Sequence, residues 1–191
     1  AGNLDFGYGL GHPSSGTKVS RIDYSNDTAT ALERGLLATQ TSEATASGNA
    51  EFGYVFGGVH GGSRLSTTQR VDYANDTATG VTKGPLTVAR QSLASTGDTS
   101  FGYMSGGKTG TVFSTVDRID YSNDTATASP KGPLSAARYL HARASARSDA
   151  LSVLGPSLVS NTAAMSVLNP TKVGYFIGGH NPTFTTIERI D

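Results

Sequence analysis

The sequence predicts an all-β protein, a β-propeller made of four-stranded blades of about 49 residues. Three observations predict a propeller. The chain repeats itself, each repeat divides into short strand-like segments between turns, and glycine gathers at one end of each repeat. The 24 glycines and 7 prolines among 191 residues also indicate many turns and few helices.

An aromatic-Gly-Tyr string marks the start of the repeat. Its copies are Phe6-Gly7-Tyr8, Phe52-Gly53-Tyr54, Phe101-Gly102-Tyr103 and Val173-Gly174-Tyr175. The tyrosines are separated by 46, 49 and 72 residues, so the third repeat carries an insertion of about one half-repeat.

A glycine pair follows the tyrosine. The pairs are Gly57-Gly58, Gly106-Gly107 and Gly178-Gly179, with a degenerate Gly9-x-Gly11 in the first copy. The first strands of propeller blades crowd around a central channel, where glycine lets backbones approach and adopts tight turns. We therefore expect the aromatic-Gly-Tyr segment to be the first, innermost strand of each blade.

The next string reads Arg-apolar-Asp-Tyr and alternates polar with apolar side chains. In the third copy Arg118 and Asp120 lie on one face of an extended strand, and Ile119 and Tyr121 lie on the other. The equivalent residues in the other copies are Arg21, Tyr24, Arg70, Tyr73 and Arg189. We expect the tyrosines to pack between blades, and the charges of the Arg-x-Asp pairs, such as Arg21 and Asp23, to interact with one another within a blade or across to the neighbouring blade.

Turn residues separate the remaining strands. Ser-Asn-Asp favours a turn, because Asn and Asp tolerate left-handed backbone and cap it with their own side chains. Thr-Ala-Thr is expected to resume as the third strand, Gly132-Pro133 to break the chain, and the segment from Leu134 to Leu140 to form the fourth strand.

These spacings define one propeller domain, or a segment of one, over residues 1–191. The expected parts are blade 1 at 5–50, blade 2 at 51–99, blade 3 at 100–149, an insertion at 150–171 and a partial blade 4 at 172–191. Two arrangements fit. The chain is a partial ring, which the repeat interrupted at Asp191 favours, or the apolar insertion completes a compact four-bladed ring.

The repeat resembles the kelch family. A kelch motif runs from an apolar-aromatic strand into a double glycine, then to a Tyr in an Asp-containing turn, a Pro-containing segment and an Arg. The third copy supplies Gly106-Gly107, Asp120-Tyr121, Gly132-Pro133-Leu134 and Arg138. The kelch Trp is replaced by Thr30, Thr79 or Thr127. The resemblance covers nearly the whole chain outside the insertion and implies a divergent kelch-like propeller.

Two amino-acid strings of the repeat show a second resemblance. The strings Asp-Tyr-Ser-Asn-Asp-Thr-Ala-Thr and Lys-Gly-Pro-Leu-Ser-Ala-Ala-Arg are similar to those in repeat-rich structural proteins of marine bacteriophages, in particular cyanophages. There such repeats occur in tail-fibre-like or virion-surface proteins. The resemblance implies a virion-surface, extracellular location, with other virion proteins or copies of itself as partners and host-surface carbohydrate as a ligand.

Composition excludes several classes of function. Fifteen basic and fifteen acidic residues give a net charge of zero, so no basic field attracts nucleic acid. The absence of cysteine excludes disulfides, thiolate nucleophiles and Cys-ligated metals. No apolar run approaches the ~20 residues of a membrane span. We expect no cofactor and no metal.

The candidate ligand-binding residues follow the glycines. They are His12, His60, Lys108 and His180. Side chains at equivalent loops lie on one face of a propeller and can ring a channel mouth, where they would bind an anion or a sugar. The other interpretation is that these are solvent-facing turns. Neighbouring blades would hold the imidazoles too far apart to share one metal ion.

The expected function is a non-enzymatic structural or adhesive module of a virion fibre or surface appendage. No repeat contains an acid, base or nucleophile that the others lack. The alternatives are a kelch-type protein-interaction scaffold and a galactose-oxidase-like enzyme. That enzyme needs a Cys cross-linked to a Tyr, and this chain has no Cys. The aliphatic insertion at 150–171 is the expected contact with a neighbouring subunit.

Overall fold

The computed structural model describes residues 1–11, 17–145, 174–179 and 184–190, and from residue 143 onward only the backbone. Every strand pairing is antiparallel and the described residues contain no α-helix. The all-β prediction is confirmed. The insertion at 150–171, with its predicted subunit contact, lies outside the described residues.

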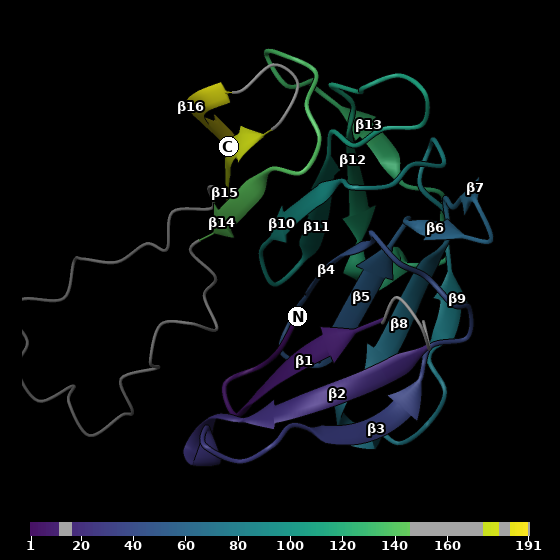
Figure 1. Cartoon of the computed structure of the whole chain (residues 1–191), viewed down its shortest axis with the longest axis vertical. Coiled ribbons are helices and arrows are strands. Elements are labelled where there is room, and N and C mark those ends of the chain that lie inside the picture. Colours follow the sequence, from purple (N-terminus) through teal and green to yellow (C-terminus); the bar gives the residue numbers. More distant parts are fainter. Residues whose placement is uncertain (12–16, 146–173, 180–183, 191) are drawn as a thin grey trace, which may run out of the picture.

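Four sheets follow one another along the chain (Figure 1). The first contains β1 (Phe6–Leu10), β2 (Lys18–Asp23) and β3 (Leu32–Leu36). The second contains β4 (Thr45–Gly48), β5 (Phe52–Phe56), β8 (Thr68–Asp72) and β9 (Val81–Lys83). The third contains β10 (Ala94–Gly97), β11 (Phe101–Ser105), β12 (Val116–Asp120) and β13 (Ser129–Lys131). The fourth contains β14 (Ala142–Ser145), β15 (Gly174–Gly179) and β16 (Phe184–Ile190), and a small hairpin pairs β6 (Val59–His60) with β7 (Ser63–Arg64).

The aromatic-Gly-Tyr strand was predicted to be the first strand of each sheet, and in three sheets it is not. The second, third and fourth sheets open with β4, β10 and β14, so the aromatic-Gly-Tyr strand comes second. Boundaries at 51 and 100 therefore cut through the β4–β5 and β10–β11 hairpins. Strands such as Thr45–Gly48 lack apolar alternation, yet Thr45 and Ser47 are buried. Their burial comes from neighbouring sheets, which no local pattern reveals.

The third and fourth predicted strands are also wrong. Thr-Ala-Thr is a bend, and the segment from Leu134 to Leu140 is irregular. The outer strand instead lies between these two segments, as in β9 and β13. Its partner in pairing is the Arg-apolar-Asp strand, with Arg70 opposite Val81 and Arg118 opposite Ser129.

The Asp-Tyr-Ser-Asn-Asp string forms a 3-10 turn rather than a continuing strand. These turns span Tyr24–Asn26, Tyr73–Asn75 and Tyr121–Asn123. The preceding aspartate caps each one: the Asp120 carboxylate accepts the Ser122 backbone N–H at 2.9 Å. The turn directs the tyrosine ring out of the strand and toward the preceding sheet.

The core lies between sheets, where these tyrosines stack. The Tyr73 ring lies 4.5 Å from the Tyr8 ring of the first sheet, and the Tyr121 ring lies 4.8 Å from the Tyr54 ring of the second. Tyr24 is the exception, because no described sheet precedes it, and it is 53% exposed. For Tyr24 the prediction of a core position is therefore wrong.

Glycine in the aromatic-Gly-Tyr string is required by this turn. A Cβ on Gly102 would lie 2.7 Å from the Tyr121 hydroxyl, and one on Gly53 would lie 2.8 Å from that of Tyr73. The later pairs have positive φ, with Gly57 at 60° and Gly58 at 99°. Side chains are thus excluded for two separate reasons, close packing in the first case and backbone conformation in the second.

A further glycine brings the outer strand of one sheet onto the loop of the next. The Gly84 N–H donates to the Asp124 carbonyl at 2.8 Å, and a Cβ on Gly84 would lie 1.8 Å from the Ala126 carbonyl oxygen. Gly132 is its equivalent in the third sheet, and no described atom lies within 4 Å of a Cβ built there.

This pair of glycines tests the contact between sheets. Gly84→Ala should lower the free energy of unfolding by about 2 kcal/mol, because the added methyl group separates the second and third sheets. Gly132→Ala should change it by less than about 0.5 kcal/mol. Urea unfolding of the two variants measures both values. Equal effects would contradict the described packing at Gly84.

Candidate functional site

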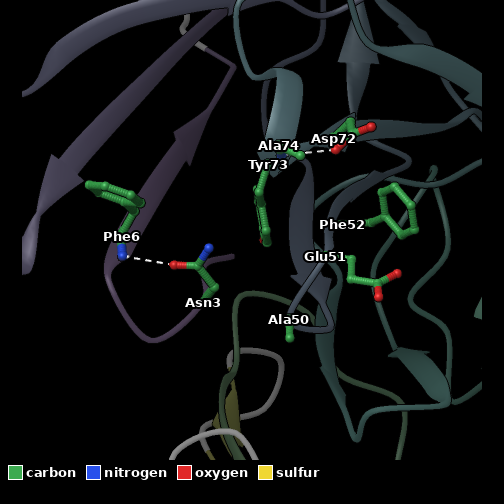
Figure 2. A pocket seen from close by; sticks show the side chains of 8 residues that line it. All are labelled: Asn3, Phe6, Ala50, Glu51, Phe52, Asp72, Tyr73 and Ala74. Carbon is green, nitrogen blue, oxygen red and sulfur yellow. Dashed lines mark hydrogen bonds between the residues drawn. The ribbon is translucent and has the colours of Figure 1, made fainter.

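Two equivalent grooves open between successive sheets, at the end of the molecule that carries the 3-10 turns. The first has a volume of about 510 Å³ and lies between the first and second sheets (Figure 2). It is lined by Asn3, Phe6, Ala50, Glu51, Phe52, Asp72, Tyr73 and Ala74. The second, of about 440 Å³, is lined by Asn49, Glu51, Phe52, Thr99, Ser100, Phe101, Asp120, Tyr121 and Ser122.

Tyr73 forms the floor of the first groove. Figure 2 shows its ring between Asn3 and Phe6 on one side and Ala50, Glu51 and Phe52 on the other. Tyr121 lines the second groove from the equivalent position. The stacking of each tyrosine on the preceding sheet therefore sets the depth of the groove.

Short turns place the aromatic rims. The Asn3 side-chain oxygen accepts the N–H groups of Asp5 and Phe6, at 3.0 and 2.9 Å. Asn49 holds Glu51 and Phe52 in the same way, at 3.0 and 2.8 Å. These side chains shape the turn.

An arginine covers one face of each rim phenylalanine. The Arg21 guanidinium carbon lies 4.2 Å from the centre of the Phe6 ring, and those of Arg70 and Arg118 lie 4.3 Å from Phe52 and Phe101. This cation–π contact fixes the orientation of the ring. The grooves therefore have rigid aromatic walls.

Among the acidic residues that line the grooves, Glu51 has a carboxylate with no bonding partner among the described residues. It is exposed, it lines both grooves, and it makes no side-chain hydrogen bond or ion pair with the described residues. Asp72 and Asp120 cap the turns instead. The Ser122 hydroxyl and N–H lower the pKa of Asp120. Fixed aromatic walls beside a carboxylate can bind a hydroxyl-rich ligand, which stacks C–H groups and donates hydrogen bonds.

One buried carboxylate joins the first sheet to the second, and another joins the second sheet to the third. Asp76 of the second sheet accepts a hydrogen bond from the Tyr8 hydroxyl at 2.9 Å and from Arg21 at 3.0 Å, and pairs with Arg34 at 2.7 Å. Asp124 of the third sheet has the same set, with Tyr54 at 2.9 Å, Arg70 at 2.8 Å and Lys83 at 3.1 Å. We call each set a Tyr-Arg-Asp latch.

The latches correct the predicted Arg-x-Asp pairing. Arg21 and Arg70 do reach a neighbouring sheet, but their partner is the Asp of the Asn-Asp-Thr string and not Asp23 or Asp72. That Asp is present in all three copies, and turn chemistry alone explained it at the level of sequence. Arg189 is placed by backbone register opposite Tyr175, as Arg21 is opposite Tyr8.

The latches shift the pKa values of their members. Burial raises the pKa of Tyr8 to about 12, and the hydrogen bond to Asp76 adds to this. Burial and Asp124 raise the pKa of Tyr54 in the same way. Burial would raise the pKa of Asp76, but hydrogen bonds from Arg34 and Tyr8 outweigh it, so the net pKa is lowered.

A buried ion pair outside the latches was not predicted. Arg90 and Asp117 are both fully buried and meet at 3.0 Å between the second and third sheets. Thr87 also donates to Asp117, from its hydroxyl at 2.7 Å and its N–H at 3.1 Å. The position of Asp117 holds Gln69 in the second sheet, which bonds to Thr39 through both amide atoms. Because the residue type at this position differs between the second and third sheets, the repeat pattern of the sequence does not reveal the contact.

The described residues include two of the four predicted ligand-binding residues, His60 and Lys108. His12 and His180 lie outside the described residues. His60 is exposed in the β6–β7 hairpin. Lys108 corresponds to Val59 and not to His60, because the two residues form equivalent β-bridges. Val59 pairs with Ser42 before the second sheet, and Lys108 pairs with Gln91 before the third. Its ammonium lies 4.2 Å from the centre of the Tyr139 ring.

The described part of the chain contains no cluster of His, Asp or Glu that could hold a metal ion. It also contains no helix that is long and apolar enough to span a membrane. No protein-family model and no curated protein sequence matches the chain.

The latch predicts a pH dependence of stability. Asp76→Asn should cost about 2 kcal/mol at pH 7, because hydrogen bonds to a charged group are lost. A lowered pKa in the folded state means that the contribution of Asp76 is present above the unfolded pKa of about 3.9. It is lost as pH falls through the folded value, so the difference between the two proteins should shrink below about pH 4.

Urea unfolding between pH 3 and pH 7 measures this dependence. Asp5→Asn is the matched control, because Asp5 is exposed and its carboxylate makes no contact among the described residues. A cost for Asp76→Asn that stays constant over this range would show that the charge of Asp76 does not stabilise the fold.

Proposed function

We propose that this chain is a structural and glycan-binding module of a virion fibre or surface appendage, in which each sheet serves as one blade of a kelch-like propeller. The module is not an enzyme. It binds neutral, hydroxyl-rich glycan in the grooves between blades. The pair of equivalent grooves that share Glu51 and Phe52 carries the proposal.

Contacts between the inner strands support the propeller arrangement. The Thr45 hydroxyl of β4 and the Ser95 hydroxyl of β10 lie 2.9 Å apart. The Ser92 N–H donates to the Glu43 carbonyl at 2.8 Å, and the Leu140 N–H donates to the Ser92 carbonyl at 3.0 Å. The same residue position thus links one sheet to the next twice. One relation applied repeatedly between sheets is how a propeller is built.

The composition of the grooves favours a neutral glycan. Glu51, Asp72 and Asp120 would repel an anionic ligand, whereas carboxylates accept hydrogen bonds from sugar hydroxyls. Flat rings such as Phe52 pack against the C–H face of a sugar. Two equivalent sites on one chain also raise avidity for a repetitive surface.

The charged side chains support a structural role over catalysis. Asp76, Asp117 and Asp124 are buried, and each is paired with a cation across a sheet boundary. The pairs made by Asp76 and Asp124 recur from one sheet to the next, as structural contacts do. The proposal that the protein belongs to a virion is based on the resemblance of the repeat strings to those of phage structural proteins.

A protein-interaction scaffold is the second candidate, and one observation favours it. Leu32 and Leu36 on β3 and Val81 on β9 are exposed, at 56%, 47% and 52%. These outer strands would present apolar side chains to a protein partner. Polar substitution of all three would then abolish partner binding and leave the grooves unchanged.

Glycan binding can be tested on the full chain. We expect neutral oligosaccharides on a glycan array to bind, and Glu51→Gln to weaken the best of them at least tenfold in calorimetric titration. Glu33→Gln is the control, because Glu33 is an exposed acid on β3, remote in sequence from both groove linings. A glycan affinity unaffected by Glu51→Gln would remove the grooves as the site.

The same sample tests the absence of catalysis. The bound oligosaccharide should be recovered intact after prolonged incubation. Turnover that one point mutation abolishes would overturn the non-enzymatic assignment.

A further inference from the structure

One short turn separates the two grooves. Residues 49–51 connect β4 to β5, and we call them the shared turn. Ala50 lines the first groove, Asn49 lines the second, and Glu51 lines both. Ala50 and Glu51 are exposed, and the side chain of Ala50 is only a methyl group. The grooves are therefore immediate neighbours, and the Glu51 carboxylate borders both of them.

Aromatic rims stand on both sides of the shared turn. Phe6 lines the first groove, Phe101 lines the second, and Phe52 lines both. An arginine over one face holds each ring. Sheets that pack face to face lie about 10 Å apart, so a chain of a few sugars reaches from one rim to the next. The rims can therefore contact successive parts of a single ligand.

Carboxylates follow the same order as the rims. Asp72 lines the first groove, Asp120 lines the second, and Glu51 lines both. Asp72 and Asp120 accept the capping N–H groups of Ala74 and Ser122. An ionised carboxylate has roughly four acceptor sites, so these groups can also accept hydrogen bonds from sugar hydroxyls. None of the residues that line the two grooves is basic, which favours a neutral ligand along the whole path.

We infer that one linear chain of neutral sugars lies across both grooves at once, with its middle on Glu51 and Phe52. The inference rests on the proposed glycan binding and names the ligand more closely, as an oligosaccharide long enough to occupy two grooves. Once the chain fills one groove, its contact with the other is intramolecular. Its affinity should therefore exceed that of a short sugar by on the order of a hundredfold.

Calorimetric titration of the full chain with glucose oligomers tests the inference. The probes are the β-linked series from cellobiose to cellohexaose and the α-linked series from maltose to maltohexaose, because both are neutral and linear. In at least one series a single hexasaccharide should bind per protein, on the order of a hundredfold more tightly than the disaccharide.

The failure of the inference differs from the failure of glycan binding. Two hexasaccharides per protein, an affinity that does not rise with length, or binding of neither series would overturn the inference. Glycan binding itself fails only when no neutral oligosaccharide on the array binds. The number of hexasaccharides bound by the unmodified chain does not depend on how any variant folds.

A large side chain placed in one groove at a time gives the decisive comparison. Ala74 and Ser122 occupy the same position in successive 3-10 turns and line the first and the second groove, respectively. Ala74→Trp and Ser122→Trp should each lower hexasaccharide affinity by roughly tenfold or more, because each leaves one groove for the ligand. Ser25→Trp is the matched control. Ser25 has the same position in the turn Tyr24–Asn26 but lines neither groove, so the affinity should stay unchanged.

Circular dichroism of the three variants should match that of the unmodified chain, since all three positions are exposed. A loss of affinity in only one of the two groove variants would place the ligand in a single groove and overturn the inference. An equal loss in the Ser25→Trp control would place the ligand outside both grooves.

Discussion

The structure depends on the latch, in which one buried carboxylate binds a tyrosine and two cations from the preceding sheet. A single sheet of three or four short strands cannot bury both of its faces. Asp76 and Asp124 solve this by fixing where the next sheet lies. Buried charges are costly unless they are paired and hydrogen-bonded, so only one placement of the neighbouring sheet satisfies them.

The grooves are a consequence of this placement. The arginine that reaches the latch also covers the rim phenylalanine, as Arg70 does with Asp124 and Phe52. The tyrosine that forms the floor is held by stacking on the preceding sheet. The same side chains therefore hold the sheets together and shape the proposed glycan site, so the second and third sheets each add a groove of the same kind.

The same repeat residues are buried to different extents in the first and second sheets. Val71 and Tyr73 are covered because a sheet precedes them, whereas Ile22 and Tyr24 are exposed. The residue types are nearly the same in each case. Exposure here reports the position of a sheet in the series and not the character of its residues.

The sequence by itself determined the all-β class, the length of the repeat, the insertion and the strands Phe-Gly-Tyr and Arg-apolar-Asp, because these depend on periodicity and turn residues within about ten positions. Only the tertiary structure decided that Thr45–Gly48 is a strand and that the partner of Arg21 is Asp76. It also decided that Glu51 lines two grooves. The physical reason is distance along the chain: contacts between sheets join residues roughly one repeat apart, and no local pattern distinguishes a polar residue at a turn from one that a neighbouring sheet will bury.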